Sequence, residues 1–294
     1  MPRVSVCISV YNGAATLRET LESAFAQTYR DFEVLVLDDG SSDDSADIAE
    51  SIGARVVRQA NAGRGAALAR MMDLAKGEWI ALLDADDVWL PQKLEVQIKS
   101  VDETNVDLIH SGGWFDYPDG RQELRSGLHG DPQQAWDHIL PHNQIIASSA
   151  AFRRSSILEA GNFSPDTWSA CDWYGWLVMA PRCRFGYLAE PLVRYRIREG
   201  SIANKGFRFQ SGKRHVLKDL ILPRADELLA GNSRAARYKR MISTGIGVAA
   251  STMAKYLDAE GKKIEARELH REAIRLSPSV LRVWTRALGS CLRP

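Results

Sequence analysis

The stretch Trp79-Ile80-Ala81-Leu82-Leu83-Asp84-Ala85-Asp86-Asp87 decides the fold assignment, because a run of apolar residues ends abruptly in three carboxylates. Successive apolar residues of this kind are typical of a strand buried on both faces of a parallel sheet. In an open parallel sheet, ligands bind beyond the carboxyl ends of the strands. Asp84 and Asp86 can there hold a hard divalent cation between them. The alternative is a solvated turn that caps a helix beginning near Pro91.

The same pattern occurs earlier in the chain, where another short strand ends in acidic residues. Residues 32–37 are followed directly by Asp38 and Asp39. Segments with helical spacing separate the strands, and this alternation predicts an α/β fold with a mostly parallel open sheet flanked by helices. The strand ends then open on one edge, so Tyr11, Asp39 and Asp86 share one crevice. The expected strands cover 3–10, 32–37, 54–58, 79–83 and 107–110, and the expected helices lie around 17–25 and 66–74.

The second part of the chain is less regular. Residues 111–144 are rich in glycine, proline and aromatic residues, which indicates hairpins and loops of the kind that carry recognition. From about Lys205 onward the pattern is helical and charged. We therefore expect one domain over 1–204, with halves at 1–110 and 111–204, and a helical C-terminal region over 205–294. Further expected elements are strands over 145–152 and 186–198 and short helices over 154–160 and 172–180.

Charge is distributed unevenly along the 294 residues. The net charge is only +1, yet residues 201–294 hold 19 Lys and Arg against 8 Asp and Glu, which leaves the preceding residues at about −10. A basic helical region can touch anionic lipid headgroups or an acidic partner, and a solvated helical surface is the alternative. We expect no nucleic-acid partner.

The cysteines do not form a metal-binding or disulfide pattern. Cys7, Cys171, Cys183 and Cys291 are scattered, without a Cys-x-x-Cys spacing. The chain enters a strand within a few residues of its start, and no stretch approaches the roughly 18 apolar residues that span a bilayer. The sequence therefore predicts a soluble cytoplasmic protein that is at most peripheral to a membrane.

Taken in order, several motifs in the first 200 residues resemble the family 2 glycosyltransferases. The resemblance implies the A-type glycosyltransferase fold, which is Rossmann-like, and inverting transfer of a sugar from a nucleotide-sugar donor to an acceptor hydroxyl. It implies UDP-, GDP- or dTDP-sugars as donors, bound by the 1–110 half, and a carbohydrate or lipid-linked acceptor, bound by the 111–204 half, in surface-polysaccharide or glycan assembly. The motifs lie in 4–12, 36–43, 61–70, 77–87, 161–163, 171–173 and 190–198.

The resemblance also assigns roles to residues that bind the donor. Ser9 and Tyr11 correspond to the turn that lines the nucleotide base, where an aromatic ring offers a stacking surface. Asp39 matches the carboxylate that accepts a hydrogen bond from the base. Arg70 corresponds to a basic residue near the diphosphate, and a guanidinium group suits phosphate oxygens. The alternatives are a turn aromatic for Tyr11 and a surface arginine for Arg70.

Further roles concern the metal and the chemistry. By resemblance, Asp86 coordinates Mg²⁺ or Mn²⁺ together with the donor diphosphate, while Asp84 assists the metal and reaches the ribose or the sugar. Asp172 matches the general base that takes the proton from the acceptor hydroxyl, and a helix N-cap aspartate is the alternative. The chain departs from the family pattern at Cys171, where glutamate is frequent, and at Arg198, where histidine is usual. We expect Arg198 to contact phosphate, because arginine does not ligate metals.

Two other functions remain open at this point. Residues 63–69 mimic a degenerate dinucleotide-binding fingerprint, which would fit a nucleotide-dependent oxidoreductase. The departures at Cys171 and Arg198 would fit a catalytically inactive relative that acts as a scaffold through its basic helices.

Overall fold

The computed structural model describes residues 1–126, 135–198 and 206–292, with side chains through 288. The chain divides into two compact units, Met1–Glu199 and Gly200–Pro294. The expected domain boundary between 204 and 205 lies outside the described residues and stays a prediction, as does the part of the expected loop region that falls in 127–134. Each unit is described below by itself.

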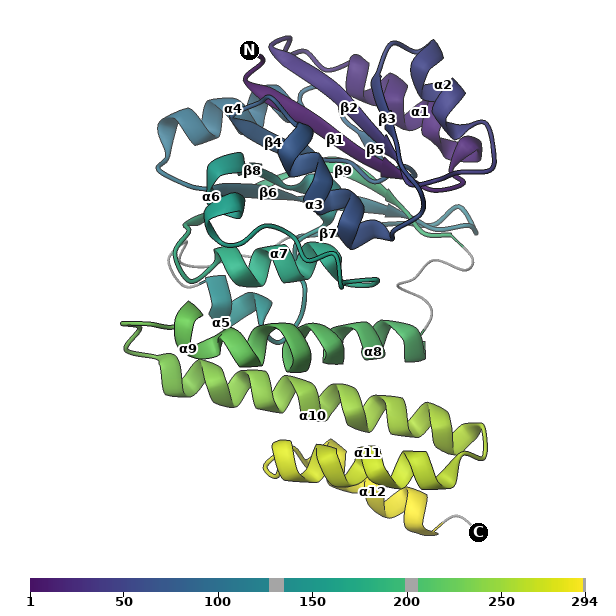
Figure 1. The fold of residues 1–294 in the computed structure, drawn as a ribbon, viewed down its shortest axis with the longest axis vertical. Helices are drawn as coiled ribbons and strands as arrows, with labels where there is room; N and C mark the ends of the chain where they lie inside the picture. The colour runs from purple at the N-terminus through teal and green to yellow at the C-terminus, as the bar shows by residue number, and fades with distance from the viewer. Residues whose placement is uncertain (127–134, 199–205, 293–294) are drawn as a thin grey trace. The chain divides into compact units, whose positions relative to one another are not determined.

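The first unit is built on one nine-stranded sheet with the order β3-β2-β1-β4-β8-β6-β9-β5, in which β7 pairs with β6 (Figure 1). The strands are β1 (Val4–Val10), β2 (Phe32–Asp38), β3 (Arg55–Arg58), β4 (Trp79–Leu82), β5 (Val88–Trp89), β6 (Leu108–Asp116), β7 (Gln122–Arg125), β8 (Ala151–Arg153) and β9 (Phe185–Arg196).

The N-terminal half of this sheet is parallel, as its sequence predicts. β1 lies between β2 and β4 and runs parallel to both, and β3 is parallel to β2. The other half is mixed, because β8 is antiparallel to β4 and β6 while β9 is parallel to β6. The predicted class of α/β sheet flanked by helices is confirmed, with its parallel part in β1–β4.

The expected strand over 145–152 is shorter than predicted. A 3₁₀ turn, η2 (Ala147–Ser149), precedes β8, and its serines make polar contacts. Ser149 Oγ donates to the Ile146 carbonyl oxygen at 2.8 Å, and Ser148 Oγ donates to Asp87. These hydrogen bonds hold the chain in a turn although the flanking residues are apolar.

Helices cover both faces of the sheet. α1 buries Leu17, Leu21 and Ala24, which have the spacing of one helical face. These side chains pack on a core of fully buried strand residues that includes Ile8 and Val36. The helices of the unit are α1 (Ala14–Phe25), α2 (Ser45–Ser51), α3 (Arg64–Leu74), α4 (Lys93–Glu103), α5 (Ala135–Ile139), α6 (Arg154–Glu159) and α7 (Cys171–Met179).

The second unit is helical, as predicted. α10 and α11 form a hairpin that turns at Gly261, whose φ of 77° is in the left-handed region that glycine favours. Ala250, Ala273 and Val283 join α10, α11 and α12 in one small core. Among the described helices, none combines the length and apolar character that crossing a bilayer requires. The elements are α8 (Gly206–His215), the π-helical turn η4 (Val216–Ile221), η5 (Leu222–Arg224), α9 (Ala225–Leu228), α10 (Ala235–Ala259), α11 (Lys263–Leu276) and α12 (Leu281–Leu292).

Candidate active site

Three carboxylates gather at the end of β4. One oxygen atom from each of Asp84, Asp86 and Asp87 lies within 4.8 Å of the others. The side chains of Asp84 and Asp86 are 21% and 23% exposed, whereas Asp87 is fully buried. The backbone N–H of Asp87 donates to the Asp84 carbonyl oxygen at 3.0 Å, so a tight turn brings the side chains together. Helix α4 begins at Lys93 with Gln92 as its N-cap, so the alternative that this cluster caps a helix is wrong.

Asp87 is held rigidly behind the other two carboxylates. Its Oδ2 accepts a hydrogen bond from Ser148 Oγ at 2.5 Å, and its Oδ1 accepts one from the backbone N–H of Arg196 at 3.0 Å. Burial raises the pKa of Asp87 well above its usual range, and the charges of Asp84 and Asp86 raise it further. The end of β4 thus concentrates negative charge that water screens poorly.

Arg64, at the start of α3, partly compensates this charge. Its Nη2 donates to Asp84 Oδ1 at 2.5 Å. Burial raises the pKa of Asp84 to about 6, and the guanidinium of Arg64 opposes that rise while Asp86 and Asp172 add to it. Burial lowers the pKa of Arg64 itself, but the charges of Asp84 and Asp172 outweigh this effect, so its pKa is raised. The sequence reasoning missed Arg64, although an arginine directly after Gly63 at a helix start was a usable signal.

Asp172 lies in the first turn of α7 and belongs to the same electrostatic group. Its charge raises the pKa of Asp84 and that of Arg64. Asn143 Nδ2 donates to Asp172 Oδ2 at 2.8 Å. The N-cap of α7 is Ala170, in a left-handed conformation with φ of 57°, so the alternative of an N-cap role for Asp172 is wrong.

The ends of β1 and β2 form a second group of the predicted residues. Tyr11, directly after β1, is 56% exposed, and Ser9 is half-buried. The turn after Tyr11 is fixed by the turn after β2, because the Asn12 N–H donates to Ser41 Oγ at 2.9 Å. The Asp39 N–H donates to the Val10 carbonyl oxygen at 2.8 Å, which ties the two strand ends together. An exposed aromatic ring beside a rigid double turn can stack on a base.

Asp39 already has protein partners. Its Oδ1 accepts from Gln59 Nε2 at 2.7 Å and from the Ala62 N–H at 2.9 Å, and its Oδ2 accepts from the Gly63 N–H at 2.9 Å. Asp39 therefore positions the loop that leads into α3 and Arg64. A carboxylate oxygen accepts two hydrogen bonds, so the Oδ2 atom keeps capacity for a base N–H.

Arg70 lies near Asp39 and six residues beyond Arg64. It is exposed, and its Nη1 donates to Gln59 Oε1 at 3.0 Å. Gln59 in turn binds Asp39, which links Arg70 to the end of β2. Its assignment to the diphosphate stays a prediction.

Arg198, just after β9, reaches the acidic cluster. Its Nη2 forms an ion pair with Asp86 Oδ2. The chain therefore presents a cation to the carboxylate predicted to bind the metal and the diphosphate. A nearby tyrosine, Tyr195, has its pKa raised by burial and by the three carboxylates of β4.

Cys171 and Gly65, which belong to the sequence features that suggested the scaffold and oxidoreductase alternatives, have packing roles. Cys171 is buried, and its Sγ donates to the Thr167 carbonyl oxygen at 3.3 Å. A Cβ atom on Gly65 would lie 2.4 Å from the Ser164 carbonyl oxygen, so this glycine allows the close approach of α3 to the 164–167 loop. The glycine pattern of 63–69 is thereby explained in part without a dinucleotide.

Solved structures of glycosyltransferases share this fold. The S. aureus TarS 1-349 crystal structure matches with a TM-score of 0.63 and 17% identity, over 98% of this chain and 90% of that one. The mannosyltransferase PcManGT from Pyrobaculum calidifontis, in complex with GDP-Man and Mn²⁺, matches with a TM-score of 0.58 and 18% identity, over 98% and 87% of the two chains. The predicted A-type glycosyltransferase fold is confirmed.

Sequence relatives agree. A UDP-Glc:alpha-D-GlcNAc-diphosphoundecaprenol beta-1,3-glucosyltransferase, WfaP of Escherichia coli, is 28% identical over 225 residues, which are 75% of this chain and 87% of that protein. An uncharacterized glycosyltransferase of Rickettsia prowazekii is 41% identical over 111 residues, covering 37% of this chain and 35% of the relative. The family model for glycosyl transferase family 2 matches residues 5–161, which is just over half of the chain and includes the fingerprint-like residues 63–69. The protein is therefore a member of glycosyltransferase family 2.

Proposed function

We propose that this glycosyltransferase works by an inverting mechanism that depends on a divalent cation at the end of β4. The observation that carries this proposal is the group of three carboxylates within 4.8 Å, two of them with raised pKa values. Clustered carboxylates of this kind repel one another until a cation joins them. Oxygen ligands from carboxylates also suit Mg²⁺ and Mn²⁺.

The residues divide the work of holding the cation and the donor. Asp86 and Asp84 would hold Mn²⁺ or Mg²⁺, while Asp87, whose two oxygens already accept hydrogen bonds, would orient the turn. Arg198 would move from Asp86 to the donor diphosphate, and Arg64 would remain with Asp84. A bound cation would supply stabilisation of the negative charge that grows on the leaving diphosphate.

Asp172 is the general base in this scheme. Asn143 holds its Oδ2, so we assign its Oδ1 to the acceptor hydroxyl. The acceptor oxygen would bond to the anomeric carbon as the bond from that carbon to the diphosphate breaks. The hydroxyl proton would pass to Asp172, and the nucleoside diphosphate would leave.

The donor is a nucleoside diphosphate sugar, and we propose a UDP-sugar. Tyr11 would stack on the base, Ser9 would line it and Asp39 would accept its N–H, with Arg70 near the diphosphate. Support comes from the E. coli relative that uses UDP-Glc, and TarS has been crystallised with UDP-GlcNAc. The acceptor would be a lipid-linked or free glycan in polysaccharide assembly, in line with the diphosphoundecaprenol in the relative's name.

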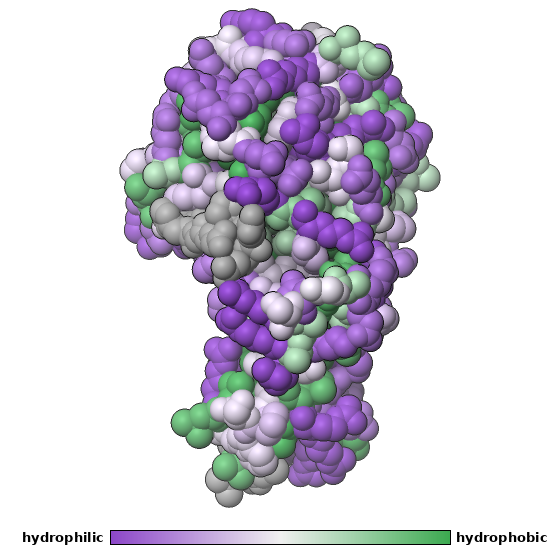
Figure 2. Space-filling model, turned by 90° about the vertical axis from the view of Figure 1, so that its left-hand side faces the viewer, coloured by the Kyte–Doolittle hydropathy of each residue, from purple (hydrophilic) through white to green (hydrophobic). Residues whose placement is uncertain are grey.

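A lipid-linked acceptor would bring the protein to a membrane surface, and we propose α12 as the contact. Leu281, Trp284 and Leu288 lie on one face of α12, and all three are exposed. Figure 2 shows hydrophobic side chains at the surface toward the bottom of the view. Together with the basic charge of residues 201–294, this face suits anionic lipid. Vesicles of phosphatidylglycerol should retain the protein, and Leu281→Glu/Leu288→Glu should release it.

Incubation with radiolabelled UDP-sugars tests the proposed function. With Mn²⁺ we expect slow donor hydrolysis, and transfer when a GlcNAc-diphosphate-lipid acceptor is added. EDTA should abolish both. Donor binding without turnover on any acceptor would favour the inactive scaffold, and unchanged turnover in EDTA would remove the cation from the mechanism.

A further inference from the structure

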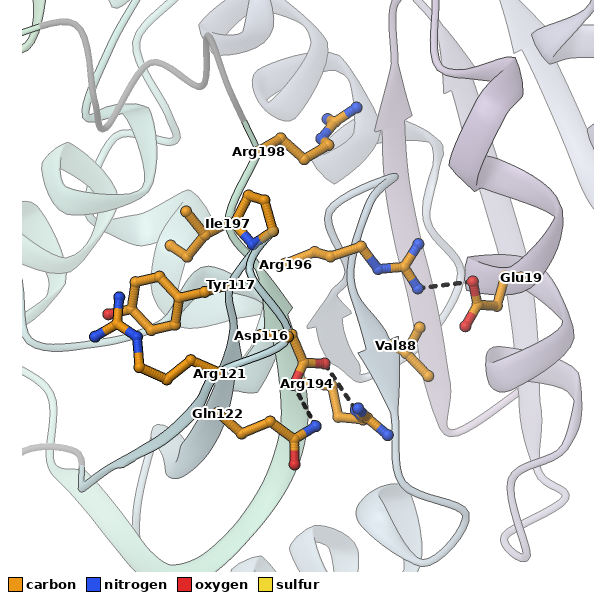
Figure 3. A pocket seen from close by; sticks show the side chains of 12 residues that line it. Glu19, Val88, Asp116, Tyr117, Arg121, Gln122, Arg194, Arg196, Ile197 and Arg198 are labelled. Atoms are coloured by element: carbon orange, nitrogen blue, oxygen red, sulfur yellow. Dashed lines mark hydrogen bonds and ion pairs between the residues drawn. The ribbon is translucent and has the colours of Figure 1, made fainter.

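A pocket of about 600 Å³ opens at the end of β9, next to the acidic cluster. Four arginines line it, together with Glu19 of α1, Val88 of β5 and residues of the β6–β7 hairpin (Figure 3). Among the lining residues, only Arg198 belongs to the set assigned to the donor. A cavity of this volume is typical of a small-molecule site.

The four guanidinium groups come from β9, from the segment just after it and from the β6–β7 turn. Arg194 and Arg196 are two residues apart on β9, so their side chains share one face, and Arg198, just beyond the strand, also lines the pocket. Arg121 comes from the β6–β7 turn and stacks over the Tyr117 ring at 4.1 Å. The turn is closed by the Tyr117 N–H, which donates to the Arg121 carbonyl oxygen at 2.9 Å.

The arginines have partners that an anion can replace. Arg194 Nε lies 2.8 Å from Asp116 Oδ2, and Arg196 Nη2 lies 2.7 Å from Glu19 Oε2. In each pair one side chain faces water, since Arg194 is 45% exposed against 20% for Asp116, and Glu19 is 63% exposed against 26% for Arg196. An anion from solution can therefore compete for these arginines. Arg121 Nε lies 3.5 Å from Asp119 Oδ2, and Arg198 pairs with Asp86, so each of the four guanidinium groups has a carboxylate partner.

The pocket also borders the reaction centre. The backbone N–H of Arg196 donates to Asp87, and Arg198 pairs with Asp86. Val88, which lines the pocket, directly follows the acidic cluster in the chain. A ligand in the pocket therefore lies beside the carboxylates at the end of β4.

We propose that this pocket binds the diphosphate of a lipid-linked acceptor through Arg121, Arg194 and Arg196, while Arg198 at its border serves the donor. Guanidinium groups bind phosphate oxygens in pairs of hydrogen bonds, and three of them suit two linked phosphates. In a sugar-diphosphate-lipid acceptor only the sugar separates the diphosphate from the hydroxyl that reacts. The assignment deepens the proposed function and rests on it for the identity of the acceptor.

Calorimetry with farnesyl diphosphate tests the pocket directly. Binding should occur in EDTA, because arginines need no metal, and should persist with saturating UDP and Mn²⁺, because the donor occupies other residues. Arg121→Gln/Arg194→Gln should weaken it at least about tenfold in both conditions. Arg58→Gln, which removes a similarly paired surface arginine, should leave it unchanged.

A second variant predicts the opposite sign and does not depend on the folding of the first. Glu19→Gln frees Arg196 from its carboxylate and removes a negative charge from the lining, so farnesyl diphosphate should bind several-fold more tightly. Unchanged or weaker binding by Glu19→Gln would overturn the proposal.

Three further outcomes distinguish the proposed acceptor diphosphate from the donor, from a lipid headgroup and from a wrong donor assignment. Displacement of farnesyl diphosphate by UDP with Mn²⁺ would reassign the pocket to the donor and overturn the proposal. Competition by phosphatidylglycerol vesicles with the same arginine dependence would make it a headgroup site and overturn it too. If UDP itself fails to bind while the EDTA titration behaves as expected, the donor assignment fails and the anion pocket stands.

Discussion

The ends of β4 and β9 are neighbours with opposite charge and different exposure. At the end of β4, Asp87 is buried and its pKa is raised by burial and by Asp84 and Asp86. At the end of β9, the Arg194 side chain is 45% exposed, and its partner Asp116 is 20% exposed. The comparison shows two ways to prepare a site. Buried like charges store a free-energy cost that a cation relieves, whereas exposed arginines exchange one anion for another at little cost.

The largest expected effect comes from Asp172, which lies at the end of neither β4 nor β9. Asp172→Asn should lower kcat by about 10²–10⁴-fold, because the acceptor proton loses its base. The Kd for UDP should stay unchanged, because the residues assigned to the nucleotide and the cation lie at the ends of β1, β2 and β4. Single-turnover kinetics and calorimetry check both values, with Asp47→Asn as an exposed control. Transfer at the wild-type rate would refute the assignment of the base.

The role of the acidic end of β4 can be tested at Asp86. Asp86→Ala should weaken Mn²⁺-dependent UDP binding by about 10–100-fold or more, because even outer partners of a metal site have effects of that size. Binding measured in EDTA should change little. Equal loss in EDTA would mean that Asp86 contacts the nucleotide without a cation.

Asp87 tests the cost of burying charge at the end of β4, through the free energy of unfolding and its pH dependence. Asp87→Asn keeps both hydrogen bonds, since its amide can donate to Ser148 Oγ and its oxygen can accept from the Arg196 N–H. The variant without metal should be more stable than the wild type at pH 7, because burial and the charges of Asp84 and Asp86 disfavour the ionised Asp87 carboxylate.

The sign of the pH dependence follows from the raised pKa. As pH rises above the unfolded value of 3.8, the unfolded carboxyl ionises while the buried one keeps its proton, so the wild type loses stability. The gain from Asp87→Asn should therefore be larger at pH 7 than at pH 5 in urea unfolding with EDTA. A gain that falls as pH rises would contradict the electrostatic account.

The smallest expected effect lies at the exposed end. Arg194→Gln should change the free energy of unfolding by less than about 1 kcal/mol, because exposed ion pairs contribute little. Thermal unfolding at pH 7 measures it. A larger loss would show that the arginine supports the fold and is not held ready for a ligand.

The sequence predicted the parallel half of the sheet better than the mixed half. Strands such as β1 and β4 are continuous apolar runs with polar ends, and this pattern is local. β8 has only three residues and follows a turn whose serines bond to residues far away in the chain, among them Asp87. Such hydrogen bonds are set by tertiary structure, so no local pattern announces them.

The candidate site was predicted in the same uneven way. Asp84, Asp86, Asp172 and Arg198 do gather, because each follows or begins a regular element. Arg64 and the arginine pocket were missed, since a charged residue at a helix start or near the end of a strand is typical of a solvated surface. Only the register of β9 with β6 and the pairing with β5 brings these arginines to one cavity.

The central claim is that the carboxylates of β4 bind a nucleotide through a divalent cation. Calorimetric titration of UDP into the wild-type protein, with Mn²⁺ and with EDTA, tests it most directly. We predict that Mn²⁺ tightens UDP binding at least about tenfold and that Asp86→Ala removes this gain. Equal affinity in the two conditions would contradict the claim.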